Sequence, residues 1–343
     1  MTKIAINGFG RIGRLLFKRI YKEFDVVAIN DLGDPENLAY LLRYDTVYGV
    51  LYGKYKAKVI EENGEKYFFM NEEKKIRILQ EKDPKNLPWK NLGIDIVIEA
   101  TGVFDSFEKA NMHCEAGAKR VVITAPAKDE DGSLGKTVLV GINDEDFEGV
   151  RITSNGSCTT NAVTPVIQIL SETLGIEKAM LNTVHAYTAT QSVVDSPVKG
   201  KDWRRGRAGA QNIIPSTTGA AIVVGRVIAE VRGKFDGIAM RVPVPTGSIA
   251  DITMVTKKNT TPEEVNEILK NAEKEKRWEG IIRTSEDGIV SSDILGESYG
   301  AIIDLPFTKV VGGNLVKVLS WYDNEAGYVS MLLRHIRGAA KFL

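Results

Sequence analysis

The feature that most constrains the fold is a glycine pattern close to the N-terminus. Gly8, Gly10 and Gly13 have the spacing GxGxxG between a strand-like segment at residues 3–7 and a segment with helical spacing at residues 11–23. In such a strand–helix unit, the first glycine allows a tight turn, the second lets the backbone approach a pyrophosphate, and the third permits close helix–strand packing. The helix N-terminus then faces the phosphates. The pattern predicts a nucleotide-binding unit, although such glycines also occur as simple turn residues.

An acidic residue after the next strand-like segment supports nucleotide binding. Residues 25–30 form an apolar run, and Asp31 follows it directly. A carboxylate about 20 residues beyond the glycine pattern is where a ribose-binding acid is expected. This position favours the nucleotide site over the turn-only interpretation.

Strand-like and helix-like segments continue to alternate through the first half of the chain. Apolar runs occur at residues 95–100, 120–124 and 137–141, and a helix-like segment at 107–116 separates two of them. This alternation predicts an α/β domain with a doubly wound parallel sheet of the Rossmann type.

The second half has a different pattern, in which long strand-like runs dominate. They lie at residues 178–188, 235–244, 248–257, 301–305 and 315–321. Few helices interrupt them, which predicts an α+β domain with a mostly antiparallel sheet. We therefore expect one domain at residues 1–157 and a second at 158–324, followed by a single helix at 325–343.

The composition excludes several classes of protein. Lys plus Arg number 45 and Asp plus Glu number 45, so no net charge attracts nucleic acid or an acidic membrane. Two cysteines do not make a disulfide framework. No secretory signal is apparent, and no apolar run approaches the roughly 18 residues of a membrane span. We expect a soluble cytoplasmic protein without a membrane or nucleic-acid partner.

Cys158 is the most chemically suggestive residue of the chain. It lies where a strand-like segment ends near Ser154 and an apolar helical pattern begins. A helix N-terminus stabilises a thiolate through the helix dipole and free backbone N–H groups. A buried structural cysteine is the alternative from this segment alone. We predict that Cys114, inside an amphipathic segment, is structural.

One of the three histidines is a candidate base. His185 ends a strand-like run and precedes a hydroxyl-rich segment, so it is placed to activate a thiol, although the residues alone leave a structural role equally open. His113 and His335 lie within helical patterns, and we predict that both are ordinary helix residues.

Three further segments carry features of anion sites. Residues 203–207 form an arginine-rich loop, which could be a solvated surface, a subunit contact or an anion site. Thr218 and Gly219 precede an apolar helix, a position that often binds anions. Arg241 lies within a strand-like run, where a charge needs a partner such as a substrate phosphate.

Together these segments resemble the phosphorylating glyceraldehyde-3-phosphate dehydrogenases. The matching motifs are INGFGRIGR at residues 6–14, SCTTN at 157–161, HAYTATQ at 185–191, AQNIIPSTTGAA at 210–221, RVPVP at 241–245 and WYDNEAGY at 321–328. They occur in the order typical of that family and cover nearly the whole chain. The resemblance implies an NAD-binding domain, a catalytic and tetramerisation domain, a terminal helix that packs back onto the first domain, and a homotetramer.

The resemblance also implies roles for particular residues. Cys158 would be the nucleophile and His185 its activating partner. The cofactor-binding positions would be Gly8, Gly10, Arg11, Ile12, Gly13, Asp31, Arg77, Thr124, Asn324 and Tyr328. One phosphate site would use Ser157, Thr159, Thr218 and Gly219, and the other would use Thr188, Arg205 and Arg241. No metal is expected.

The sequence departs from the common family pattern at a few positions. Gly156 replaces a frequent alanine, Ala162 replaces a frequent second cysteine, and Ser196 lies at a position that varies with nucleotide preference. The loop before Arg205 is also longer than in many members. None of these changes removes a group that the chemistry needs.

The activity implied is the oxidation of D-glyceraldehyde 3-phosphate to 1,3-bisphosphoglycerate, with NAD and inorganic phosphate, through a thioester on Cys158, in glycolysis or gluconeogenesis. One alternative is an erythrose-4-phosphate or semialdehyde dehydrogenase of the same architecture. Another is a non-catalytic nucleotide-binding or RNA-binding protein, in which Cys158 and His185 would be idle.

Overall fold

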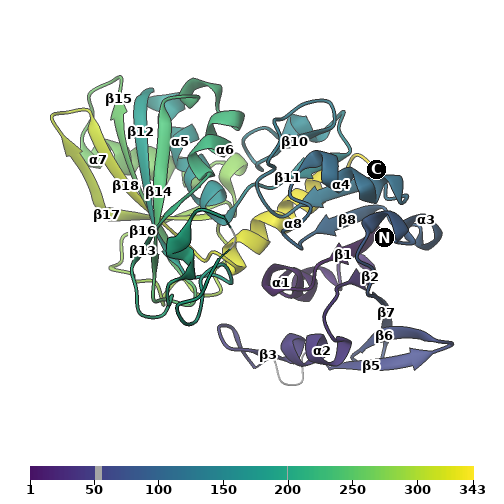
Figure 1. Ribbon diagram of the computed structural model, residues 1–343. Coiled ribbons are helices and arrows are strands. Elements are labelled where there is room, and N and C mark those ends of the chain that lie inside the picture. The colour runs from purple at the N-terminus through teal and green to yellow at the C-terminus, as the bar shows by residue number, and fades with distance from the viewer. Residues whose placement is uncertain (51–55, 199) are drawn as a thin grey trace. The chain divides into compact units, whose positions relative to one another are not determined.

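The chain forms two compact units, seen here in a computed structural model that describes residues 1–50, 56–198 and 200–343 (Figure 1). Unit 1 comprises Met1–Val138, Asp144–Asn155 and Leu332–Leu343, and unit 2 comprises Leu139–Asn143 and Gly156–Met331. None of the helices among the described residues is long and apolar enough to cross a membrane.

Unit 1 is built on a nine-stranded sheet of order β10-β11-β9-β8-β1-β2-β7-β6-β5. Its strands are β1 (Lys3–Asn7), β2 (Asp25–Asn30), β5 (Ala57–Glu62), β6 (Glu65–Met70), β7 (Lys74–Leu79), β8 (Ile96–Glu99), β9 (Arg120–Ile123), β10 (Gly135–Thr137) and β11 (Ile152–Ser154). All neighbours from β10 to β7 are parallel, and only β6 and β5 add antiparallel pairs at one edge. The predicted doubly wound parallel sheet is therefore confirmed.

The helices of unit 1 follow the parallel strands in the chain. They are α1 (Arg11–Ile20), α2 (Pro35–Arg43), α3 (Trp89–Leu92) and α4 (Phe107–Glu115), with the short turns η1 (Pro84–Asn86) and η2 (Asp144–Phe147) and a two-stranded ribbon of β3 (Tyr44–Asp45) and β4 (Gly49–Val50). The apolar side of α1 is buried, as the helical spacing predicts. The helix ends at Ile20, where the backbone N–H groups of Glu23 and Phe24 both donate to the Ile20 carbonyl and turn the chain toward β2.

One predicted strand of unit 1 is wrong in its position. The apolar run at residues 137–141 is not a strand; β10 ends at Thr137, and Leu139–Asn143 belong to unit 2. There the Leu139 N–H donates to Asn143 Oδ1 at 2.9 Å instead of to a neighbouring strand. The run is apolar because its residues are buried, not because they extend the sheet.

A buried polar network lies beneath the loops that follow β1 and β8. The indole N–H of Trp89 donates to His113 Nδ1 at 3.0 Å, and His113 Nε2 lies 3.0 Å from Glu99 Oε2 and 3.3 Å from Asn7 Nδ2. The other oxygen of Glu99 accepts the Thr101 N–H at 2.8 Å. His113 thus contributes to packing, in agreement with the prediction of an ordinary helix residue.

The C-terminal helix α8 (Ala326–Ala340) supplies the last segment of unit 1. His335 is fully buried, its Nδ1 lies 3.1 Å from the Val138 carbonyl, and its Nε2 lies 2.7 Å from Thr153 Oγ1. Burial lowers the pKa of His335 to about 3, so the ring is neutral. It therefore donates from Nδ1 to Val138 and accepts the Thr153 hydroxyl at Nε2.

Unit 2 is built on a seven-stranded sheet of order β13-β14-β12-β15-β18-β17-β16. Its strands are β12 (Ile176–Ala186), β13 (Ile214–Thr217), β14 (Phe235–Val242), β15 (Ser248–Thr256), β16 (Ile282–Ser285), β17 (Ala301–Val311) and β18 (Leu315–Tyr322). All neighbours are antiparallel except β12 with β14 and β16 with β17. The predicted mostly antiparallel sheet is confirmed. Strand β17 is longer than predicted because a register shift between Asp304 and Lys309 accommodates Pro306 within it.

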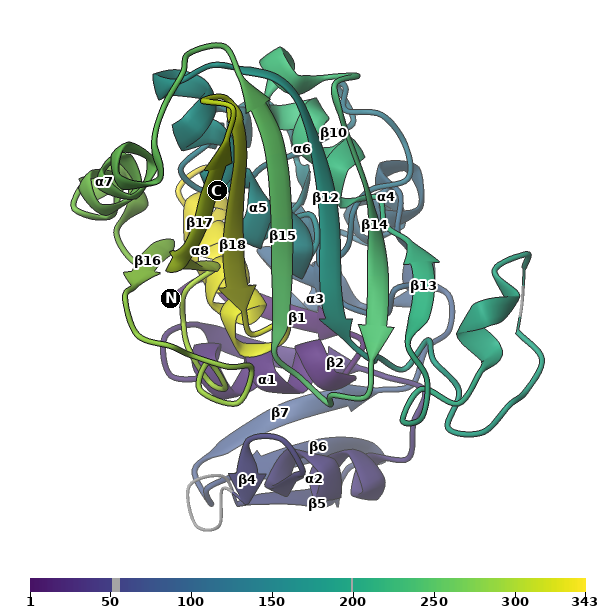
Figure 2. The same cartoon turned by 90° about the vertical axis from the view of Figure 1, so that its left-hand side faces the viewer.

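Helices cover one face of this sheet. The helices of unit 2 are α5 (Cys158–Thr173), α6 (Ala220–Val227) and α7 (Pro262–Glu273), with the short turns η3 (Trp203–Gly206), η4 (Ala229–Val231) and η5 (Lys276–Trp278). Val163, Val166 and Leu170 of α5 pack with Ile252 and Val318 of the strands in the main core of the unit. In Figure 2 the strands β12, β14 and β15 lie in front of α5 and α6, so the opposite face of the sheet is turned to the viewer.

Candidate active site

Cys158 is the first residue of α5, and the local sequence fixes it there. Ser157 is the N-cap: its Oγ accepts the Thr160 N–H at 3.1 Å, while Thr160 Oγ1 accepts the Ser157 N–H at 3.3 Å. Gly156 precedes them with a φ of +61°, a left-handed conformation that favours glycine. The thiol therefore lies at the positive end of a 16-residue helix.

The structure brings His185 to this thiol. His185 is almost completely buried near the end of β12, and its Nε2 lies 3.4 Å from Cys158 Sγ. The two residues come from separate elements, so their contact depends on the packing of α5 against the sheet. A nucleophile within reach of an imidazole nitrogen is the arrangement needed for covalent catalysis.

The other nitrogen of His185 has two close neighbours. Parallel pairing of β12 with β14 places Arg241 opposite His185, and Arg241 Nη1 lies 2.6 Å from His185 Nδ1. The Ala186 carbonyl oxygen lies 2.7 Å from the same nitrogen. Arg241 Nη1 also donates to that carbonyl at 3.1 Å.

Burial controls the ionisation of the pair. Burial raises the pKa of the Cys158 thiol, against the opposing effects of the Arg241 charge and of hydrogen bonds at the start of α5. Burial, reinforced by the Arg241 charge, lowers the pKa of His185 to about 3. The resting site therefore favours a neutral thiol beside a neutral imidazole, which has one unprotonated ring nitrogen.

The hydroxyl groups of Thr159, Thr183 and Tyr322 form a cluster that the sequence did not indicate. Tyr322 Oη lies 2.9 Å from Thr159 Oγ1 and 2.7 Å from Thr183 Oγ1. Burial raises the pKa of Tyr322, so the phenol stays protonated. The Thr159 hydroxyl, predicted to contact phosphate, is thus directed to Tyr322. The motif at residues 321–328 contained Tyr322, but nothing local marked its partners.

One other cationic group, Arg205, acts on Arg241. Burial lowers the pKa of Arg241, and the positive charge of Arg205 adds to this effect. The Nε of Arg241 is buried and has no hydrogen-bond partner among the residues that the structure describes. Arg205 itself donates to Asp202 at 2.7 Å. Neighbouring arginines with an unused donor are suited to an anion.

The remaining predicted phosphate residues lie in loops of unit 2. The Thr188 hydroxyl lies 2.9 Å from Thr190 Oγ1 in the segment after β12. Thr218 Oγ1 accepts the Ala220 N–H at 3.2 Å, and Gly219 is the N-cap of α6 with open space where a side chain would be. The Ser157 hydroxyl is engaged in capping α5, as described above.

The three glycines after β1 have the three geometries that their motif needs. Gly8 has a φ of +97°, and a Cβ there would lie 2.6 Å from the Ala100 backbone. A Cβ on Gly13 would lie 2.2 Å from the Gly8 carbonyl oxygen, whereas one on Gly10 would meet nothing within 4 Å. Gly8 and Gly13 therefore serve close backbone packing, and Gly10 leaves room for a phosphate group.

Asp31 is held by the glycine loop. Its Oδ2 accepts the Phe9 N–H at 2.6 Å, and its Oδ1 accepts the Gly33 N–H at 2.8 Å. Two other predicted cofactor residues pair with acids: Arg11 with Asp45 at 3.1 Å, and Arg77 with Glu65. Ile12 is half-buried in the first turn of α1, and Thr124 directly follows β9.

The last two predicted cofactor residues belong to unit 2. Asn324 Oδ1 accepts the Gly247 N–H and the Ser248 hydroxyl, each at 3.0 Å, so the amide group has a fixed orientation with its NH₂ as the remaining donor. Tyr328 Oη donates to the Gly156 carbonyl at 3.3 Å. The described residues contain no group of three or more His, Cys, Asp or Glu side chains that could hold a metal.

Comparison with known proteins decides the family. The model of the family described as "Glyceraldehyde 3-phosphate dehydrogenase, NAD binding domain" matches residues 2–107, and that of its C-terminal domain matches residues 157–324. The chain belongs to the glyceraldehyde-3-phosphate dehydrogenase family. It is similar to the glyceraldehyde-3-phosphate dehydrogenases of Thermotoga maritima, at 51% identity over 96% of each chain, and Clostridium pasteurianum, at 47% over 99% of each.

Membership of the glyceraldehyde-3-phosphate dehydrogenase family makes this chain an NAD-dependent oxidoreductase. This sets aside the non-catalytic interpretation of the sequence. The observed glycine geometries and the anchored Asp31 fit the binding of a dinucleotide to unit 1.

We predict that NAD is preferred over NADP. The fixed carboxylate of Asp31 should accept hydrogen bonds from the ribose hydroxyls and repel a 2′-phosphate. Asp31→Asn keeps an acceptor oxygen but removes the charge. It should therefore lower the ratio of kcat/KM with NAD to kcat/KM with NADP by roughly tenfold, about 1.4 kcal/mol. The measurement is kcat/KM with each coenzyme for both proteins. Equal efficiency of wild type with both coenzymes would refute the role of Asp31.

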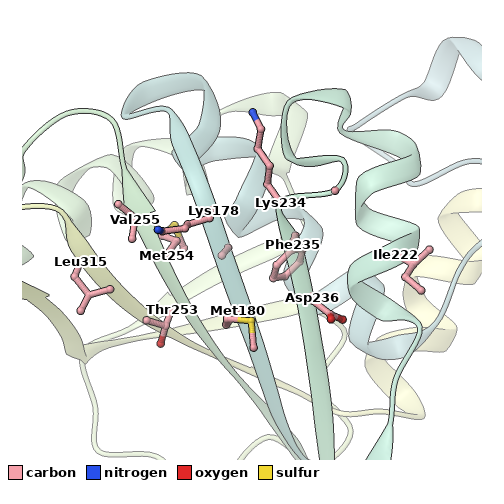
Figure 3. A pocket seen from close by; sticks show the side chains of 12 residues that line it. Lys178, Met180, Ile222, Lys234, Phe235, Asp236, Thr253, Met254, Val255 and Leu315 are labelled. Atoms are coloured by element: carbon pink, nitrogen blue, oxygen red, sulfur yellow. The ribbon is translucent and has the colours of Figure 1, made fainter.

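The glyceraldehyde-3-phosphate dehydrogenase fold also carries a cavity apart from Cys158. A space of about 630 Å³ lies on the sheet of unit 2. Figure 3 shows its lining, which includes Met180, Phe235, Thr253 and Leu315 from β12, β14, β15 and β18. None of the predicted site residues contributes to it.

Proposed function

We propose that this chain oxidises D-glyceraldehyde 3-phosphate to 1,3-bisphosphoglycerate, with NAD and inorganic phosphate, as a step of glycolysis or gluconeogenesis. The observation that carries the proposal is the 3.4 Å contact between Cys158 Sγ and His185 Nε2, with Arg241 beside it. A thiol, a base and a cation in one place suit covalent oxidation of a phosphorylated aldehyde.

Covalent chemistry begins at the sulfur of Cys158. Sγ adds to the aldehyde carbon while the thiol proton passes to Nε2 of His185, which returns it to the carbonyl oxygen to give the hydroxyl of a hemithioacetal. When the hydride leaves, Nε2 takes this hydroxyl proton. His185 is neutral at the start and can therefore take this proton. NAD, when bound, supplies the hydride acceptor for the oxidation. The acyl group then remains on Sγ as a thioester, and attack by inorganic phosphate releases the acyl phosphate.

Two anion sites follow from this chemistry. The substrate's phosphate would bind Thr188, Arg205 and Arg241, where the unused Nε of Arg241 offers a donor. Inorganic phosphate would bind at two helix starts, those of α5 and α6. Its residues would be Ser157, Thr159, Thr218 and Gly219. Backbone N–H groups at helix starts suit a small anion.

NAD would be held by the cofactor residues that the sequence predicts. In unit 1 the glycine loop would receive the pyrophosphate and Asp31 the ribose, while the amide NH₂ of Asn324 would orient the nicotinamide. The proposed set is Gly8, Gly10, Arg11, Ile12, Gly13, Asp31, Arg77, Thr124, Asn324 and Tyr328. The three acceptor contacts that fix the Asn324 amide support its role as a donor.

We also propose that the chain forms a homotetramer through the open face of the unit 2 sheet. Met180, Ile238 and Leu315 are apolar side chains exposed on this sheet, at 59%, 45% and 41%. The cavity in Figure 3 lies on the same strands. Apolar surface of this kind is common at subunit interfaces. A second copy of the chain, packed sheet to sheet, would cover it and form one of the two dimers that make up the tetramer.

Withholding phosphate tests the proposed reaction. Without phosphate, the enzyme should release one equivalent of reduced cofactor per site and then stall, because the thioester lacks its acceptor. Phosphate or arsenate should restore steady turnover. Stopped-flow absorbance at the reduced nicotinamide band provides the measurement. Sustained turnover in phosphate-free buffer, with the free acid as product, would mean that water is the acceptor.

Paired variants separate the two anion sites in the same assay. Thr218→Val should raise the KM for phosphate more than the KM for the aldehyde, because it removes a hydroxyl beside the start of α6. Arg241→Ala should do the reverse. An equal effect of both variants on both requirements would contradict the assignment of two separate sites.

A further inference from the structure

Polar side chains end three neighbouring strands of the unit 1 sheet. Asn7 is the last residue of β1, Asn30 of β2 and Glu99 of β8, and the pairing register places Asn7 beside both of the others. All three side chains are buried. Strand β1 lies where the strand order reverses, with β2 on one side and β8 on the other. Doubly wound sheets bind dinucleotides at such a point, outside the carboxyl ends of the strands.

A line of hydrogen bonds joins these three strand ends. Asn7 Nδ2 donates to Glu99 Oε2 at 2.5 Å, and Asn7 Oδ1 accepts from Asn30 Nδ2 at 2.7 Å. The Asn30 amide continues the line to the segment after β7, where it accepts the Glu81 N–H and donates to the Glu81 carbonyl, each at 2.9 Å. Because a loop begins directly after each of the three strands, the line fixes the starting point of each loop.

Glu99 anchors the loop after β8 with its second oxygen. Oε1 accepts the Thr101 N–H at 2.8 Å and the Thr101 hydroxyl, whose oxygen in turn accepts the Val103 N–H at 3.0 Å. This loop adjoins the glycine loop, since a Cβ on Gly8 would lie 2.6 Å from the Ala100 backbone. One carboxylate therefore holds the two loops at the place where they meet.

These contacts require an acceptor at both oxygens of residue 99. Oε2 faces the Asn7 amide, and Oε1 faces the Thr101 N–H and hydroxyl. A glutamine has the same shape, but in either orientation it would turn its NH₂ group toward one of these donors and lose that hydrogen bond. Glu99→Gln is therefore a change that breaks the line at one point while it keeps the volume of the side chain.

We propose that Glu99 is a positioning residue for the dinucleotide, which sets the affinity for the cofactor by holding the loops after β1, β2 and β8 in their binding arrangement. Those loops carry Gly8, Gly10 and Asp31, so the inference rests on the proposed cofactor site. Loops that are held in place before binding lose less conformational freedom when the cofactor binds. Loosening them should therefore weaken cofactor binding without changing the chemistry at Cys158.

Glu99→Gln should raise the Kd for NAD by roughly tenfold, the effect of leaving one buried donor without its acceptor. The Kd for ADP-ribose should rise by the same factor, because this molecule contains the pyrophosphate and the adenosine ribose but no nicotinamide. The kcat at saturating NAD and the KM for the aldehyde should keep their wild-type values. Titration calorimetry measures both Kd values, and steady-state absorbance measures the kinetic constants.

Ile96→Ala is the control for a general loss of stability. Ile96 is fully buried in β8, and strand alternation places its side chain on the opposite face of the sheet from Glu99. This variant should lower the thermal transition at least as much as Glu99→Gln but leave the Kd for ADP-ribose unchanged. If both variants raised that Kd equally, Glu99 would only stabilise the sheet, and the inference would be wrong.

Thr101 provides a milder test, because its side chain is exposed and its replacement should not impair folding. Thr101→Val keeps the volume but removes the hydroxyl contacts with Glu99 and Val103, whereas Thr101→Ser keeps both. The valine variant should raise the Kd for ADP-ribose by roughly threefold, and the serine variant should match wild type. Equal Kd values for the two variants would overturn the inference, even if Glu99→Gln did not fold.

Asp31→Ala separates this inference from the proposed cofactor site. It removes the carboxylate proposed to bind the ribose, so it should raise the Kd for ADP-ribose whatever the role of Glu99. A raised Kd in Asp31→Ala together with a wild-type Kd in Glu99→Gln would refute the inference alone. An unchanged Kd in Asp31→Ala would refute the proposed cofactor site, and the inference with it.

Discussion

Replacing Cys158 by alanine is expected to lower aldehyde oxidation by a factor on the order of 10³ or more, the scale seen when a covalent nucleophile is removed. Cys158 Sγ lies 3.4 Å from His185 Nε2 and is the nucleophile expected to hold the acyl intermediate. NAD binding should remain nearly unchanged, because the glycine loop and Asp31 belong to unit 1. Steady-state absorbance and coenzyme titration measure the two effects.

The second cysteine of the chain provides the matched control. Cys114 is 8% exposed in an apolar cluster with Phe107 and Val121, and burial raises the pKa of its thiol. Cys114→Ala should therefore leave turnover unchanged and lower only the free energy of unfolding, through lost packing contacts. A Cys158→Ala enzyme that retained a tenth of wild-type turnover would refute covalent catalysis at this residue.

Replacing His185 by asparagine is expected to lower the rate by a factor of roughly 10² to 10⁴, the usual contribution of a general base. Asparagine is polar but cannot accept the thiol proton at neutral pH. The thiol should also react more slowly with iodoacetamide, since burial raises the pKa of Cys158 and no neighbouring base would remain. Both rates can be measured on one preparation.

The structural role of His185 needs its own control in this experiment. His185 packs against Tyr322, so the variant should be checked for an unchanged thermal transition and NAD affinity before its rates are interpreted. If alkylation kinetics were the same in wild type and His185→Asn, His185 would not activate Cys158, and the 3.4 Å contact would be packing only.

Local sequence patterns, which depend on residues close together in the chain, made much of the architecture predictable. The glycine loop, α1 and the start of α5 depend on turn geometry and capping within a few residues, and they lie where the sequence indicated. The parallel sheet followed from the alternation of strands and helices. In contrast, β5 and β6 are short antiparallel strands with many charged residues, so their weak apolar pattern did not mark them.

The contacts that define the candidate site depend on long-range register. Arg241 meets His185 across 56 residues of chain because β12 and β14 pair in one particular register. A shift of one residue would turn Arg241 to the other face of the sheet. Likewise, Tyr322 reaches Thr159 and Thr183 only after β18 has joined the sheet. The sequence could name these residues but could not show that their side chains touch.

The discontinuity of unit 1 has a consequence for biosynthesis. Translation delivers β1 first, but the segment Leu332–Leu343, which completes the same unit, leaves the ribosome after all of unit 2. Until then the Val138 carbonyl and the Thr153 hydroxyl lack the His335 ring that satisfies them in the folded chain. The nascent nucleotide-binding sheet therefore stays incompletely packed until α8 has been translated, and a premature stop codon in α8 would destabilise the first-made unit of the protein.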